Sequence, residues 1–284
     1  MTIGIGLLGS EPSSTGVVPN QIILIADTMG SFGDTDSHPR LHKTFVLGDL
    51  DICAVAANQI DKASGLMAMV ESHMRLLSPH TKVLGQITNS IQMACFLFKR
   101  EQFISHVFPK YRLEPNVFAP DDKIPASLDP TIQKEWEEFD IGCDVIFGVF
   151  DHRGQASLLY VEGCSATVET ATFPGYAAIG TGLDKAMFWL SYRRHNLTMS
   201  AKLSAFHAYE AKLMAESSAH VNEHIDLIIA RHGAFWSQTS HDAGPPPPEC
   251  PITLRELERM REEFGPKQVG TFMRSASQKA EPEQ

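Results

Sequence analysis

The sequence lacks long apolar runs, an excess of positive charge and any regular spacing of cysteines. No stretch approaches the roughly 18 consecutive apolar residues that a membrane-spanning helix needs. Lysine and arginine number 24 against 34 aspartates and glutamates, and this net charge of −10 disfavours nonspecific binding to nucleic acid or anionic membranes. We therefore expect a protein that works without nucleic acid and without a membrane.

Signals for export are also missing. The first residues, MTIGIGLLGSEP, carry neither a basic leader nor a long apolar run, so they are not expected to be a secretory signal. The five cysteines are an odd number and form no Cys-x-x-Cys pair. Scattered cysteines of this kind are typical of a reducing compartment. The expected location is cytoplasmic.

The chain has 284 residues, of which 43% are hydrophobic and 20% charged, so it can bury a core. We expect one large domain over 2–236, interrupted by a proline-rich surface excursion at 107–140. A proline-rich linker is expected at 237–252, followed by a helix at 253–265 and a disordered tail at 270–284. Thr253 and Glu256 have the spacing of a capping box at the start of that helix.

Apolar patterning predicts the elements of the large domain. Strands are expected at 3–8, 21–26, 44–47, 52–57, 143–150, 156–161, 167–172, 175–182 and 225–231. Helices are expected at 59–77, 87–104, 183–194 and about 200–221. This order predicts an α+β fold, a four-layer αββα sandwich of two packed antiparallel sheets flanked by helices.

Three residues at the ends of early strands suggest chemistry: Thr2, Asp27 and Lys43. A strand-terminal Asp is usually a cap, and a Lys before a strand is usually a solvated charge. Position 2 is special, because Met1 is normally removed before a small residue. The mature chain would then begin with a threonine whose hydroxyl lies beside a free amine. That amine has a reference pKa of about 7.7–8.0 and can act as a base near neutrality.

At these residues the chain resembles the β-type subunits of the proteasome and their bacterial relatives, which are N-terminal-nucleophile (Ntn) hydrolases. The resemblance covers about 2–104 and 142–232, and the separation of Asp27 and Lys43 is the one that the family uses. The matching segments are TIGIGLLG at 2–9, ILIADTMGS at 23–31, KTFVLGDLDICAVAA at 43–57 and YAAIGTGLDKA at 176–186.

The resemblance implies a role for each catalytic residue. Thr2 Oγ would attack the scissile carbonyl, and its own amine would take the proton. Lys43 would lower the cost of deprotonation as a cation, and Asp27 would keep Lys43 charged and oriented. Thr181, in the Gly180-Thr181-Gly182 turn, would place a hydroxyl near the amine. Neither a metal nor a cofactor is implied.

The resemblance also implies how a substrate would bind. The backbone amide of Ala57 would stabilise the oxyanion, and Ser31 would pair with the backbone of an extended peptide. Uncharged residues match the family's specificity pocket and suggest small or apolar substrate side chains. These pocket residues are Leu41, Phe45, Val55 and Gln59.

A threonine endopeptidase of this type would act on peptides or unfolded proteins inside a homo-oligomer. The resemblance implies two stacked rings with six or seven subunits each, and a possible ATPase unfoldase as partner. Enclosure protects folded proteins from the active site. Inactive ring subunits with the same fold also exist, but they usually lack the threonine, aspartate and lysine that this chain carries.

The chain departs from the family in several places, among them a longer hairpin between the first two strands, Met29 in place of a common Arg and Thr181 in place of the usual Ser. Ala57 stands where the family has glycine. After the fourth helix, the family has an Asp followed three residues on by Ser, whereas this chain has ESSAHVNEHIDLI, in which Asn222 or Ser218 could substitute. The same segment offers a competing pattern, since His220, Glu223 and His224 match the H-x-x-E-H spacing of some zinc peptidases.

Overall fold

The computed structural model contains two antiparallel five-stranded sheets and six α-helices within the residues that it describes. The described residues are 3–10, 18–28, 30–32, 35–38, 42–78, 82–113, 129–163, 165, 167–171, 173–218, 221–240 and 249–264.

The first sheet has the strand order β10-β1-β2-β11-β12. Its strands are β10 (Tyr176–Gly180), β1 (Ile3–Gly9), β2 (Gln21–Ala26), β11 (Asp226–Arg231) and β12 (Ala234–Thr239). The strands β1 and β2 are buried along their whole length. Apolar layers on both sides explain why their sequences are continuous apolar runs rather than alternating patterns.

The second sheet has the order β5-β6-β7-β8-β9, and a two-stranded ribbon of β3 and β4 stands apart from both sheets. The sheet strands are β5 (Thr44–Leu47), β6 (Ile52–Asn58), β7 (Cys143–Phe150), β8 (Ala156–Val161) and β9 (Val168–Thr170). The ribbon strands are β3 (Gly30–Phe32) and β4 (Thr35–His38).

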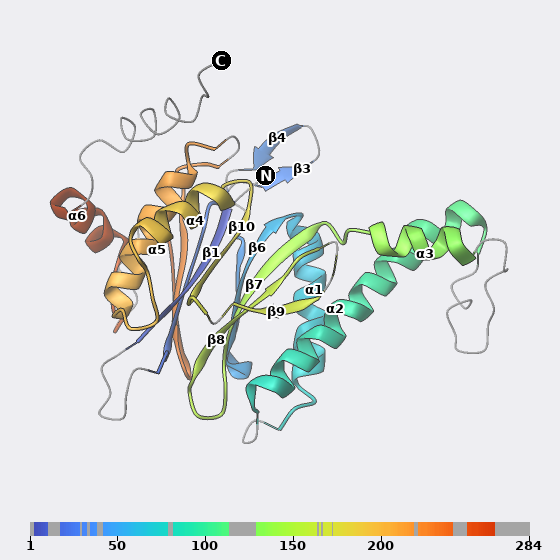
Figure 1. Cartoon of the computed structure of the whole chain (residues 1–284), viewed down its shortest axis with the longest axis horizontal. Coiled ribbons are helices and arrows are strands. Elements are labelled where there is room, and N and C mark those ends of the chain that lie inside the picture. Colours follow the sequence, from blue (N-terminus) through green and yellow to red (C-terminus); the bar gives the residue numbers. More distant parts are fainter. Residues whose placement is uncertain are drawn as a thin grey trace, which may run out of the picture.

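The sheets pack face to face, and helices cover both outer faces (Figure 1). Between the sheets, Leu24 and Ile228 of the first sheet share a buried cluster with Val55, Ile146 and Leu158 of the second. Helices α4 (Leu183–Tyr192) and α5 (Ala201–Ala215) cover the first sheet, and α1 (Ile60–Met74) and α2 (Leu84–Val107) cover the second. This confirms the mixed α+β class with two antiparallel sheets.

The structure differs from the sequence predictions in several boundaries. Helices α1 and α5 end at Met74 and Ala215, before the expected residues 77 and 221. Strand β12 was not expected, and it extends to Thr239, into the segment predicted as a linker at 237–252. Its residues AFWSQT mix apolar and polar types, so the strand depends on pairing with β11 rather than on a local pattern.

The described ends of the 107–140 excursion pack as a small cluster of their own. Helix α3 (Asp129–Glu138) places Ile132 against Phe103 and Phe108, at the end of α2 and the start of the short helix η2 (Phe108–Tyr111). The Trp136 and Phe103 rings meet edge to face, with centroids 5.2 Å apart. The middle of the excursion, 114–128, lies outside the described residues.

The C-terminal helix docks on its own domain. Helix α6 (Leu254–Phe264) begins with the predicted capping box: the Glu256 amide donates to Thr253 Oγ1 over 3.2 Å, and the Thr253 amide donates to Glu256 Oε2 over 2.8 Å. Leu257 joins the core beneath α5, and Gln238 of β12 bonds the backbone of Leu254 over 3.1 Å. The predicted tail at 270–284 lies outside the described residues.

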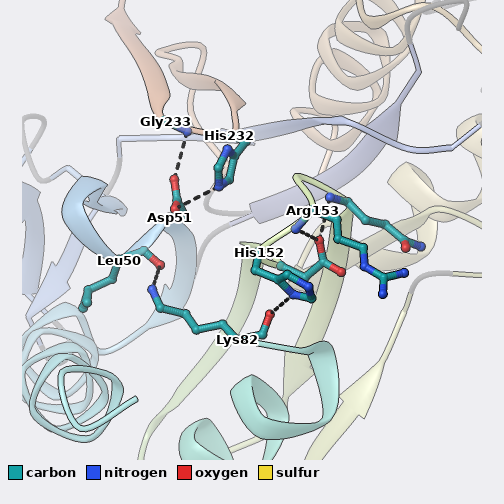
Figure 2. Close-up of polar contacts among 9 residues, drawn as sticks. Leu50, Asp51, Lys82, His152, Arg153, His232 and Gly233 are labelled. Carbon is teal, nitrogen blue, oxygen red and sulfur yellow. Dashed lines mark hydrogen bonds and ion pairs between the residues drawn. The ribbon is translucent and has the colours of Figure 1, made fainter. Parts of the chain in front are cut away.

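A polar cluster joins the turn before β6 to the β11–β12 turn (Figure 2). Asp51 accepts the amide of Gly233 over 2.9 Å and lies 3.4 Å from His232 Nε2. Because Asp51 precedes β6 and Gly233 lies in the β11–β12 turn, this contact ties the second sheet to the first. The Lys82 ammonium donates to the Leu50 carbonyl over 3.2 Å in the same region.

Among the described helices, none combines the length and apolar character that crossing a membrane requires.

Candidate active site

The strand register brings Asp27 beside the start of β1. Gly4 pairs with Ala26, and Asp27 directly follows β2. The Ile3 amide donates to Asp27 Oδ1 over 3.0 Å, and the Asp27 amide returns a bond to the Ile3 carbonyl over 3.3 Å. Thr2 itself lies outside the described residues. The residue next to it in the chain is therefore anchored directly on the Asp27 side chain.

Lys43 reaches the same carboxylate from the other sheet. Its Nζ lies 2.7 Å from Asp27 Oδ1, and neither side chain is exposed. Burial lowers the pKa of Lys43 from 10.5 to about 8, although the attraction of Asp27 and then of Asp226 opposes this change. A buried group with a strongly shifted pKa and a specific charged partner marks a candidate functional site.

The backbone of Lys43 is fixed as well as its side chain. Its amide donates to Asp226 Oδ2 over 3.3 Å, and its carbonyl accepts the amide of Ala56 over 2.9 Å. Lys43 is thus held by three residues from different parts of the fold: Asp27 directly after β2, Asp226 of β11 and Ala56 of β6.

Two buried charges near Lys43 were not among the predicted site residues. Asp226 begins β11, and Lys212 lies near the end of α5. Burial raises the pKa of Asp226 and lowers that of Lys212. The signal for Asp226 was present in the sequence, since a charged residue precedes the four apolar residues LIIA of the strand DLIIAR. Its partner could not be read, because Asp226 and Lys43 are 183 residues apart.

Among the described residues, no hydrogen bond or ion pair joins the side chain of Asn222 or Ser218, the predicted substitutes for the family's late Asp and Ser, to Asp27 or Lys43. Lys212 Nζ donates to the Asn222 carbonyl and to Glu216 Oε1, each over 2.7 Å. The Ser218 amide donates to the Ala215 carbonyl over 2.8 Å and continues the turn that ends α5. The contacts with Asn222 and Glu216 involve Lys212, which is positively charged. Its repulsion contributes to the lowered pKa of Lys43.

The Gly180-Thr181-Gly182 turn lies against the start of β1, because Gly180 pairs with Ile3. Gly180 has a φ of +88°, which favours glycine. A Cβ on Gly182 would come within 2.7 Å of the Ala215 side chain and 3.2 Å of the Ile3 side chain. The two glycines therefore let the turn approach β1 closely, and Thr181 between them is exposed.

The predicted substrate-binding residues on β6 are mostly covered in this chain. Val55 and Ala57 are fully buried in the cluster between the sheets. The Ala56 amide points to Lys43, so the neighbouring Ala57 amide points the opposite way, toward Asp144 of β7. The next amide on the Lys43 side belongs to Asn58, which ends the strand with a φ of +71°.

Of the remaining predicted contact residues, the structure describes Phe45 and Gln59 in full. Phe45 is partly buried against the core under α1 and α2, and Gln59 is exposed before α1. Ser31 is part of β3, but its side chain is outside the described part of the structure. The whole of Leu41 is also outside it.

The zinc-peptidase pattern does not form the expected helix face. Helix α5 ends at Ala215, and Glu223 and His224 lie in the loop before β11. His220 is outside the described residues. Within the part of the chain that the structure describes, no three or more His, Cys, Asp or Glu side chains gather as metal ligands.

Comparison with known proteins adds no assignment: no family model matches the chain, and no curated protein matches it.

Proposed function

We propose that the chain is a threonine-type peptidase or amide hydrolase of the Ntn class, with an αββα Ntn fold. Thr2, exposed by removal of Met1, is the nucleophile. One observation carries the proposal: Asp27 Oδ1 accepts both the Lys43 ammonium, over 2.7 Å, and the amide of Ile3, over 3.0 Å. A buried ion pair is weak evidence for stability alone. Here the ion pair shares the Asp27 oxygen with the Ile3 amide, whose nitrogen is covalently bonded to Thr2.

The reaction proceeds through an acyl-enzyme. Thr2 Oγ attacks the substrate carbonyl carbon, and the hydroxyl proton passes to the Thr2 amine. The Lys43 cation stabilises the developing negative charge on Oγ, and Asp27 holds that cation in place. The tetrahedral intermediate expels the substrate amine, which takes up a proton. Water then cleaves the ester between Oγ and the acyl group, and the product acid leaves.

The oxyanion of the intermediate needs a backbone donor on the Lys43 side of β6. Amide direction favours Asn58 over the sequence-predicted Ala57, because strand amides alternate and the Ala56 amide already faces Lys43. Thr181 supports the proposal as a hydroxyl at the turn that pairs with Ile3.

The substrate is a peptide or unfolded protein, and the working form is a homo-oligomer of stacked rings with an ATPase unfoldase as possible partner. Exposed aromatic and apolar side chains on two outer helices offer contact surface for self-association. These side chains are Met93 and Phe96 on α2 and Phe188 and Tyr192 on α4. The location that fits such a particle is the cytoplasm.

The decisive experiment identifies residue 2 as the nucleophile. Mass spectrometry of the purified protein should show a chain that begins at Thr2. An electrophile that adds to N-terminal threonine should label this residue, and peptide hydrolysis should disappear in Thr2→Ala and persist in part in Thr2→Ser. Thr170→Val, at an exposed position on β9, is the control and should keep wild-type activity. A Thr2→Ala protein with full activity would refute the proposal, and retained Met1 would favour an inactive ring subunit.

A further inference from the structure

Asp226 is a buried carboxylate whose two oxygens face two consecutive residues of the segment before β5, His42 and Lys43. Its Oδ2 accepts the Lys43 amide over 3.3 Å, and its Oδ1 lies 3.3 Å from His42 Nδ1. We propose that Asp226 is a positioning residue of the hydrolase: it holds the Lys43 backbone so that the ammonium meets Asp27. This inference rests on the proposed function.

The strand arrangement explains why such a brace is needed. Lys43 precedes β5 of the second sheet, whereas Asp27 follows β2 of the first. The ion pair therefore bridges two sheets that share no strand hydrogen bonds. Asp226 pairs with Ala26 in the first sheet and so lies beside Asp27. The side-chain bond to Asp27 and the backbone bond to Asp226 fix both ends of Lys43 against the same sheet.

Asp226 also adjusts the charge of Lys43. Among the described residues, the other charges that act on Lys43 are Asp27 after β2 and Lys212 of α5. Lys212 pairs with Glu216, and His42, before β5, faces Asp226. Asp226 attracts the Lys43 proton and raises its pKa, while Lys212 repels it. Without the Asp226 charge, Lys43 loses its proton at a lower pH, and the proposed reaction loses its cation.

His42 connects the buried Asp226 carboxylate to the protein surface. Its side chain is 68% exposed, whereas that of Asp226 is 1% exposed. The brace therefore joins a buried catalytic ion pair to a residue at the surface.

The chain contains a matched control for this carboxylate. Asp51 also accepts one backbone amide, that of Gly233, over 2.9 Å, and it also faces an exposed histidine, His232, at 3.4 Å (Figure 2). The two carboxylates lie at opposite ends of β11. Asp226 is the first residue of this strand, whereas Gly233, the partner of Asp51, follows its last residue, Arg231. Asp51→Asn removes the same negative charge from beside an amide and a histidine, without touching the proposed site.

The experiment compares Asp226→Asn, Asp51→Asn and the wild type by two measurements. The first is the pH dependence of kcat for a fluorogenic peptide. The second is the pKa of Lys43, followed by NMR of protein containing 13C-labelled lysine, with Lys43→Arg to assign the signal. For Asp226→Asn we expect kcat to fall about 10-fold at neutral pH and the basic limb of the profile to move down by roughly half to one pH unit, with an equal shift in the Lys43 pKa. Asp51→Asn should move neither.

The outcomes separate this inference from the proposed function. Asp226→Asn with the pH profile and Lys43 pKa of the wild type would overturn the positioning role, even if Thr2→Ala is inactive. An active Thr2→Ala would refute the hydrolase mechanism, while a shifted Lys43 pKa in Asp226→Asn would still support the contact. If Asp226→Asn does not fold, Asp226→Glu tests the geometry instead: we expect lower kcat with an unshifted basic limb, and unchanged kcat would overturn the inference.

Discussion

The Lys43 ammonium lies 2.7 Å from Asp27 Oδ1 in a site where neither side chain is exposed. Even at this distance the attraction does not restore the ordinary pKa of the lysine, which burial lowers to about 8. Desolvation therefore outweighs pairing, as it often does for buried ions. The same oxygen also accepts the Ile3 amide, so one carboxylate contacts both the Lys43 ammonium and the backbone at Ile3.

The shared role of this pair predicts non-additive mutations. Lys43→Ala and Asp27→Ala should each lower kcat by several orders of magnitude, and the double variant should be little worse than either, because residues that act as a unit fail together. Steady-state kinetics of the three variants test this. Thermal unfolding is the control for folding, and losses that simply multiply would contradict a shared role.

Two buried histidines predict acid sensitivity of the fold. His195 and His207 have ring centroids 5.7 Å apart, and burial lowers the pKa of each from 6.5 to about 4. Since the unfolded chain binds these protons at higher pH, stability is fully present above pH 6.5 and falls as the pH drops toward 4. The loss is on the order of 3 kcal/mol per histidine.

Urea unfolding at several pH values measures this loss. His207→Leu should have a shallower fall in the free energy of unfolding between pH 6.5 and 4 than the wild type. The same substitution at exposed His106 is the control and should leave the slope unchanged. Equal slopes in all three proteins would assign the acid sensitivity to other groups.

The docking of α6 predicts that this helix stabilises the domain. Leu257 is fully buried in the core beneath α5, so Leu257→Ala should lower the free energy of unfolding by about 2–5 kcal/mol. Phe264, on the same helix, is 68% exposed and supplies the control, since Phe264→Ala should change stability by less than about 1 kcal/mol. Chemical denaturation distinguishes the two, and a neutral Leu257→Ala would show that α6 contributes little.

The proposed assembly predicts a large particle. A double ring of 31.4 kDa chains should have a mass of several hundred kilodaltons, which light scattering measures directly. Phe188→Asp on α4 tests whether the exposed apolar surface takes part, because a charge there would oppose burial in an interface. A monodisperse 31.4 kDa species at micromolar concentration would refute the ring.

Much of the scaffold follows from local pattern alone. The strands at 21–26, 44–47, 143–150 and 156–161 have the predicted bounds, because continuous apolar runs between turn residues leave few alternatives. The capping box of Thr253 and Glu256 also forms as expected, since both partners lie within one helical turn. Asp27 and Lys43 could be selected by their places at strand ends.

The rest depended on residues that are distant in the chain. Strand β12 exists because β11 offers it a partner, and its own mixed sequence does not specify it. The contacts of Asp226 with Lys43 and of His195 with His207 arise only once sheets and helices pack. The sequence by itself determined most of the strands and helices, and it indicated Asp27 and Lys43 as candidate site residues. Only the tertiary structure decided which charges are buried together, because burial and pairing across 183 residues depend on how the two sheets stack.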